Sequence, residues 1–166
     1  MKLYLRQKVL VIGDKYRFTD SEGNLVFKGR KPALSITKMY LEDAYGEEQC
    51  YIKRRLISLM PKYKVFKGKE QVLSIRKKLK FGRPKFIIED GNSKNFEVKG
   101  SWMAWDFTVF QKGEYVGAIN KKFLRIGDTY ELDISDSYDP SLFCSIALIL
   151  DNSMHGNKQK RFGLND

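Results

Sequence analysis

The sequence predicts an all-β fold with one buried helix: a closed antiparallel β-barrel of about twelve strands around a central hydrophobic C-terminal α-helix. Three observations lead to this prediction. One strand–turn–strand plan recurs five times along the 166 residues. The chain is rich in the aromatic and β-branched residues that favour strands, and one apolar segment near the C-terminus has the caps and length of a helix. A chain of this length can bury the core of a single domain.

The repeated plan is an aromatic-rich strand, a turn with glycine or polar residues, and a second strand. Alternation of apolar and other residues, clear in "YKVF" and "FTVF", is typical of strands that bury one face. Each unit has turn-forming residues where a hairpin needs them, as in the Asp-Gly-Asn stretch at 90–92. The five units span residues 15–31, 35–56, 62–79, 85–102 and 106–123.

An opening strand at residues 2–8 and a closing strand at residues 129–134 bring the total to about twelve. A meander of this size avoids exposed edges by closing into a barrel. About eight strands can fill a barrel with their own side chains, whereas about twelve leave a lumen that must be occupied.

A helix at residues 140–152 is the segment expected to fill that lumen. Asp139 is a good N-cap, and Pro140 suits the first helical position. From Leu142 to Leu150 only Ser145 is polar, so the helix is apolar on every side, as in helices buried within a protein. It is shorter than the ~20 residues that span a bilayer, which favours a place inside the barrel.

The series "KYKVF…IRKKL", "GDTYELDIS" and an apolar C-terminal helix ending in Asp151 resembles the LURP-one-related family, in its bacterial type. That family is related to the Tubby C-terminal domain and the phospholipid scramblases. The resemblance implies the same barrel around a central helix, in a Tubby C-terminal-like domain at residues 1–152. Residues 153–166 fall outside the resemblance and are expected to form a flexible tail. Tubby domains bind phosphoinositides and some relatives act at membranes, but the resemblance transfers no catalytic motif and no lipid-binding residue to this chain.

The net charge of +11 is concentrated in the middle of the chain. Residues 51–100 contain fifteen Lys and Arg against four Asp and Glu, whereas residues 1–50 carry +2 and residues 101–166 carry −2. Such a concentration favours attraction to polyanions. Neighbouring strands are expected to gather an anion- or lipid-binding patch from Lys53, Arg55, Arg76, Lys78, Lys80, Arg83 and Lys85. The alternative is that these residues only keep the outer face of the strands soluble and unpaired.

We therefore expect a non-enzymatic domain that binds an anionic partner, first of all a phosphoinositide or another anionic lipid. Two alternatives stay open: a carrier of small hydrophobic ligands or a scaffold that uses the barrel lumen, and a weak nucleic-acid binder. Nucleic acid is less favoured because the usual basic recognition helix, zinc finger and RNP-like octapeptide are absent from the sequence. The alternation in "KYKVFKGK" (residues 62–69) is more typical of core aromatics beside solvated lysines.

Catalytic and metal-binding motifs are absent from the sequence. His155 is the only histidine, and the chain contains no GxSxG, GxxxxGK[ST], GxGxxG or HExxH. A group of acidic residues lacks the EF-hand spacing that Ca²⁺ binding would favour: Asp128, Glu131, Asp133, Asp136 and Asp139. We expect no enzyme activity, no cofactor and no metal.

The expected compartment is the cytoplasm, with peripheral association at the membrane as an option. The N-terminus lacks the apolar core of a signal peptide. Cys50 and Cys144 have no metal or redox spacing, as in a reduced intracellular protein. We expect a monomer.

Three basic triplets pose a structural question: "IKRRL" at 52–56, "IRKKL" at 75–79 and "INKKF" at 119–123. Strict alternation places the middle basic residue of each on the apolar face, where an unpaired charge is costly. Two geometries would resolve this. A β-bulge would rotate the basic pair outward, or the triplet lies at a strand end, where the middle side chain follows the core and its charge reaches the barrel rim.

Overall fold

The computed structural model describes residues 1–8, 15–55, 61–80, 83–91, 96–101, 104–123 and 128–155. Twelve strands precede one helix. They are β1 (Lys2–Lys8), β2 (Lys15–Thr19), β3 (Leu25–Arg30), β4 (Lys38–Asp43), β5 (Glu48–Arg55), β6 (Lys62–Lys67), β7 (Glu70–Lys80), β8 (Arg83–Asp90), β9 (Phe96–Ser101), β10 (Asp106–Gln111), β11 (Glu114–Phe123) and β12 (Asp128–Ile134). The helix α1 is Pro140–His155.

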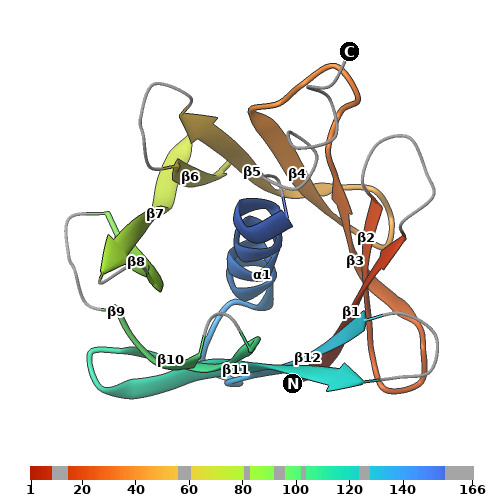
Figure 1. The fold of residues 1–166 in the computed structure, drawn as a ribbon. Coiled ribbons are helices and arrows are strands. Elements are labelled where there is room, and N and C mark those ends of the chain that lie inside the picture. Colours follow the sequence, from red (N-terminus) through yellow and green to blue (C-terminus); the bar gives the residue numbers. More distant parts are fainter. Residues whose placement is uncertain are drawn as a thin grey trace, which may run out of the picture.

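The strands form one antiparallel sheet that curls into a nearly closed barrel, which confirms the predicted architecture (Figure 1). Strands that follow one another along the chain pair with each other, apart from β8 and β9. The first and last strands also pair, with Leu3 opposite Leu132 and Leu5 opposite Tyr130. β8 and β9 are therefore the two edges of the sheet, and Figure 1 shows them next to each other.

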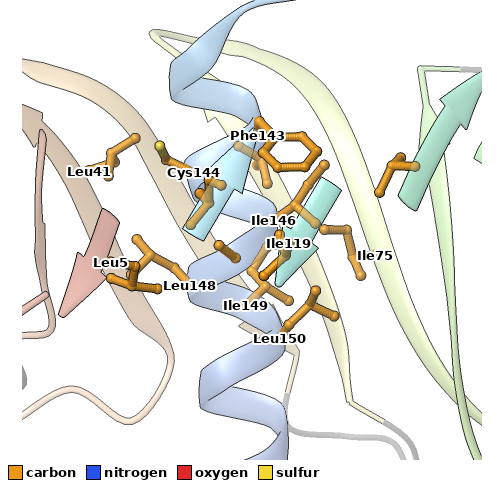
Figure 2. Close-up of a cluster of buried hydrophobic side chains, with 14 of the residues drawn as sticks. Leu5, Leu41, Ile75, Ile119, Phe143, Cys144, Ile146, Leu148, Ile149 and Leu150 are labelled. Carbon is orange, nitrogen blue, oxygen red and sulfur yellow. The ribbon is translucent and has the colours of Figure 1, made fainter. Parts of the chain in front are cut away.

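Helix α1 occupies the middle of the barrel (Figure 1). Every residue from Phe143 to Leu150 is at most 1% exposed, on all sides of the helix. In Figure 2, Cys144 and Leu148 project from one side towards Leu41 and Leu5, while Phe143 and Ile146 project from the other. The helix is thus surrounded by apolar strand residues, as its sequence predicts.

Two strand glycines allow α1 to approach the wall closely. A Cβ at Gly29 would lie 2.8 Å from a methyl carbon of Leu148. At Gly117 it would lie 2.7 Å from the Phe143 ring and from the carbonyl oxygen of Asp133. Interiors are close-packed, so these positions tolerate no side chain without a shift of the helix or the sheet.

The N-terminus of α1 is capped as predicted. The amide of Ser141 donates to Oδ1 of Asp139 at 2.8 Å, and Pro140 is the first helical residue. Nζ of Lys67, at the end of β6, forms an ion pair with the other carboxylate oxygen of Asp139. Burial acts to raise the pKa of Asp139, but the hydrogen bonds from Lys67 and Ser141 outweigh it, so the pKa is lowered from 3.8.

The helix continues beyond its predicted C-terminus at residue 152 and ends at His155. Tertiary contacts account for the extension: Asn152 and Ser153 are still buried, and they accept hydrogen bonds from Tyr63 and Lys77 of the wall. The boundary predicted between barrel and tail therefore falls within the helix, and the rest of the predicted tail lies outside the described residues.

Ile146 tests the position of the helix. Ile146→Asp would place an uncompensated charge in the apolar lumen, and we expect it to lower the free energy of unfolding by roughly 3 kcal/mol or more. The matched control is Ile36→Asp, because Ile36 is 66% exposed. Thermal or urea denaturation measures both. An Ile146→Asp variant as stable as the control would contradict the buried-helix fold.

The free energy of unfolding should depend on pH through the Asp139 carboxylate. Because its folded pKa is below 3.8, its contribution is fully present above the unfolded pKa and is lost as pH falls through the folded pKa. Asp139→Asn keeps a capping oxygen but removes the ion pair with Lys67, which is worth at most about 1 kcal/mol at this exposure. The variant should be less stable than wild type near neutral pH, and the difference should disappear in acid. A difference independent of pH would contradict the ion pair. Asp106→Asn, at an exposed position, is the control.

Candidate functional site

The strand order places the basic residues of the middle of the chain on adjoining strands. On the outside of the barrel, Lys38 of β4 lies directly opposite Lys53 of β5, and Lys53 lies opposite Lys64 of β6. Their chain neighbours Met39, Ile52 and Val65 are buried in the core, so the three lysines face outward. They form no ion pair with any described residue. The row continues to Ser74 of β7 and then Glu89 of β8.

A second basic row runs parallel to the first, nearer to one end of the barrel. Arg55 of β5 lies opposite Lys62 of β6, which lies opposite Arg76 of β7. A carboxylate oxygen of Glu89 accepts a hydrogen bond from Arg76 at 2.6 Å. Burial acts to raise the pKa of Glu89, but the Arg76 guanidinium outweighs it and the pKa is lowered. Arg76 faces outward as expected for a patch residue, but the Glu89 carboxylate compensates its charge. Its part in anion binding stays a prediction.

The remaining predicted patch residues lie on β7 and β8. Lys78 pairs with Lys85, and both side chains are exposed. Lys80 pairs with Arg83 in the backbone ladder, but their side chains lie outside the described part of the chain. We call the outward-facing described residues the basic face: Lys38, Lys53, Arg55, Lys62, Lys64, Arg76, Lys78 and Lys85. Lys38, Lys62 and Lys64 were not predicted as patch residues, because only strand pairing shows that they lie beside Lys53 and Arg55.

An aromatic row lies beside the first basic row. Tyr40, Tyr51 and Phe66 are opposite one another on β4, β5 and β6, with ring centroids 5.3 and 5.8 Å apart. The guanidinium of Arg30 stacks on the Tyr40 ring at 4.8 Å. These rings are half-buried by one another and by their neighbours, so they form a packed band on the outside of the barrel. The core aromatic expected in "KYKVFKGK" is Tyr63, which faces inward.

The two ends of the barrel differ in charge. The basic face lies towards the end where β5 and β7 stop, which we call the basic end. The turns at the opposite end contain many acids, which include Asp20, Glu22, Asp43, Glu47, Asp136 and Asp139. We call this the acidic end. Helix α1 begins at the acidic end, where Asp139 meets Lys67, and runs towards the basic end.

Comparison with known proteins identifies the family of this polarised barrel. The family model described as LURP-one-related matches residues 1–151. The chain belongs to the LURP-one-related family. It is 26% identical to the uncharacterised protein YxjI of Bacillus subtilis, over 96% of this chain and 98% of that one. It is also 27% identical to Protein LURP-one-related 10 of Arabidopsis thaliana, over 92% and 89% of the two chains.

A solved structure shares the fold. The X-ray structure of an Arabidopsis thaliana protein matches with a TM-score of 0.64 at 22% identity, covering 91% of this chain and 90% of that one. In the part of this LURP-one-related protein that the structure describes, no helix is long and apolar enough to cross a membrane.

The three basic triplets of this family member share one structural position. The amide of each middle residue donates to a carbonyl oxygen just before the neighbouring strand begins: Arg54 to Thr37 at 2.7 Å, Lys77 to Pro61 at 3.1 Å and Lys121 to Trp105 at 2.8 Å. Each triplet therefore marks the end of one ladder, and the pairing of residues 75–79 with β8 is regular. The strand-end geometry is correct for the triplets, and the bulge alternative is wrong for residues 75–79.

One of the inward basic residues contacts the C-terminal end of α1, and a second lies over a neighbouring ring of the wall. Nζ of Lys77 donates to the carbonyl oxygen of Ser153 at 3.2 Å, and Arg54 lies over the Tyr63 ring at 5.9 Å. A cation near a helix C-terminus is favourable, because the last carbonyls carry partial negative charge. Burial, with a smaller contribution from Arg54, lowers the pKa of Lys77. Lys77 thus provides a hydrogen-bond donor for one carbonyl oxygen at the helix end.

The acidic group near β12 has structural roles. Asp139 caps α1 and Asp136 forms an ion pair with the N-terminal ammonium. Glu131 lies 3.7 Å from Nζ of Lys122, and the carbonyl oxygen of Asp133 accepts from the Tyr115 hydroxyl. The side chain of Asp128 lies outside the described residues. Among the residues that the structure describes, no group of three His, Cys, Asp or Glu is placed to hold a metal ion.

The cysteines and the surface hollows add no catalytic arrangement. Cys50 and Cys144 are buried free thiols, and burial raises the pKa of both, which disfavours the reactive thiolate. One surface hollow lies at the acidic end beside Tyr115 and Tyr138, and another is lined by Tyr4, Arg6 and residues 19–23. Neither lies within the lumen, which α1 fills.

Proposed function

We propose that the protein is a non-enzymatic domain whose basic face binds the anionic headgroups of phospholipids, phosphoinositides among them. One observation carries this proposal: the direct opposition of Lys38, Lys53 and Lys64 on three adjacent strands without a described acidic partner. Like charges placed directly opposite one another destabilise a sheet by roughly 0.2–1 kcal/mol a pair. An arrangement that weakens the fold needs another use, and an external anion would relieve the repulsion.

The spacing of the rows suits several phosphate groups at once. Neighbouring strands are about 4.8 Å apart, and alternate residues along a strand are separated by about 7 Å. The basic face is therefore a grid of cations on a gently curved wall, with no described recess that would select one small molecule. Near an anionic leaflet each Lys or Arg contributes about 1 kcal/mol, so a few simultaneous contacts support reversible binding at a membrane surface.

The alternatives have less support. A carrier of hydrophobic ligands needs space in the lumen, and residues Phe143 to Leu150 are packed against the wall there. A nucleic-acid binder needs aromatic rings free to stack on bases, whereas Tyr40, Tyr51 and Phe66 stack on one another. If the basic residues only conferred solubility, the protein would not bind anionic lipid in preference to other anions. The basic residues would also not be concentrated towards one end of the barrel.

Charge reversal in the first basic row tests the proposal. Lys53→Glu with Lys64→Glu should weaken co-sedimentation with vesicles of phosphatidylcholine and phosphatidylserine by tenfold or more, at about 1 kcal/mol for each charge. Wild-type binding should also fall at high salt, because salt screens exposed charges. Vesicles of phosphatidylcholine alone and a single-stranded oligonucleotide are the comparison ligands.

The control for net charge is Lys2→Glu with Lys69→Glu, which makes the same charge change at exposed positions of the acidic end. We expect this control to bind anionic vesicles nearly as well as wild type. Equal loss in both double variants would show a response to net charge alone, and unchanged binding after reversal of Lys53 and Lys64 would contradict the proposed site. Tighter binding to the oligonucleotide than to anionic vesicles would favour the nucleic-acid alternative.

A further inference from the structure

Two aliphatic side chains project into solvent from the loop that joins β3 to β4, at the basic end. Leu34 is fully exposed at 103%, and Ile36 is 66% exposed. Single exposed apolar residues are common on soluble proteins. These two, however, share one short loop, whereas Tyr45 and Tyr115 are exposed separately at the acidic end.

The loop holds these side chains in an ordered turn. The amide of Ser35 donates to the carbonyl oxygen of Pro32 at 2.9 Å, which closes a turn around residues 33 and 34. The Ser35 hydroxyl oxygen then accepts from the amide of Lys38 at 3.1 Å, where β4 begins. Leu34 is thus presented at the tip of a hydrogen-bonded turn, so little conformational entropy is lost when the tip is buried by a partner.

The loop is continuous with the basic face. Lys38 follows it directly and is the first lysine of the row that continues through Lys53 and Lys64. An apolar tip backed by a cationic surface matches the chemistry of an anionic bilayer. Aliphatic groups enter the boundary between headgroups and acyl chains, while the cations stay with the phosphates.

We propose that the loop at residues 31–37 is a membrane anchor that inserts Leu34 and Ile36 into an anionic bilayer. This proposal rests on the proposed function. It adds that the loop enters the bilayer beyond the headgroups and that the barrel has a fixed orientation at the membrane. The basic end faces the membrane, and the acidic end, which an anionic surface repels, points away. A protein with an apolar pocket is the other class of partner that could cover such a tip, but the basic rows behind it favour the bilayer.

A fluorophore at the tip measures insertion directly. The native cysteines are buried, so Leu34→Cys provides one accessible thiol for the environment-sensitive dye NBD. With vesicles of phosphatidylcholine and phosphatidylserine we expect a blue shift, an increase in intensity and quenching by acyl-chain nitroxide lipids. Tyr45→Cys, 94% exposed at the acidic end of β4, is the matched control and should show none of these changes.

A second variant separates insertion from charge binding. Leu34→Ser with Ile36→Ser should lower the affinity for the anionic vesicles by about tenfold or more and leave the affinity for soluble inositol hexakisphosphate unchanged. If wild type binds both ligands but the double variant binds vesicles equally well and the tip label stays unchanged, the anchor is wrong and the proposed function stands. If wild type binds neither ligand, both proposals are wrong. Equal changes of the label at both positions would also overturn the anchor.

Discussion

The packing of α1 against the inside of the barrel is the constraint on which the rest of the structure depends. Twelve strands enclose more space than their own inward side chains can fill, and an apolar helix fills it. Gly29 and Gly117 mark places where helix and wall approach so closely that no side chain fits. Each end of the helix also needs polar partners, and the wall supplies Lys67 beside Asp139 at one end and Lys77 at the other.

This arrangement decides where charge can lie. Among the described residues, the apolar inner side chains pack around the helix. Most of the described Lys and Arg therefore lie on the outer face, and the inward Arg54 and Lys77 lie near the basic end. Acids are concentrated in the turns where α1 begins, and cations in the strand segments near its C-terminus. A barrel with one helix through it thereby acquires a basic end and an acidic end, and the proposed membrane orientation follows from this polarity together with the exposed loop at Leu34.

Much of the fold was predictable because its signals are local. Alternation, turn residues and the cap at Asp139 each act within a few residues, and the resemblance to the family covered nearly the whole chain. The outward direction of Lys53 and Lys78 followed from parity alone. The pairing of Arg76 with Glu89 did not, because it depends on the register of β7 with β8. The inward Lys77 was recognised as an anomaly, but its partner lies on α1, far away in sequence. The exposure of Leu34 could not be predicted from the sequence, because only the structure shows that no other part of the described chain covers this side chain.

The most direct test of the account is the orientation of the barrel at a lipid surface, measured by NMR paramagnetic relaxation enhancement from a gadolinium-chelating lipid in anionic bicelles. The account predicts the strongest broadening for amides of residues 33–38 and for the ends of β5 and β7 nearest to Arg55 and Lys78. Amides of the acidic-end turns at residues 20–24 and 44–47 should be broadened least. Uniform broadening, or broadening strongest at the acidic end, would contradict the claim that the basic end faces the membrane.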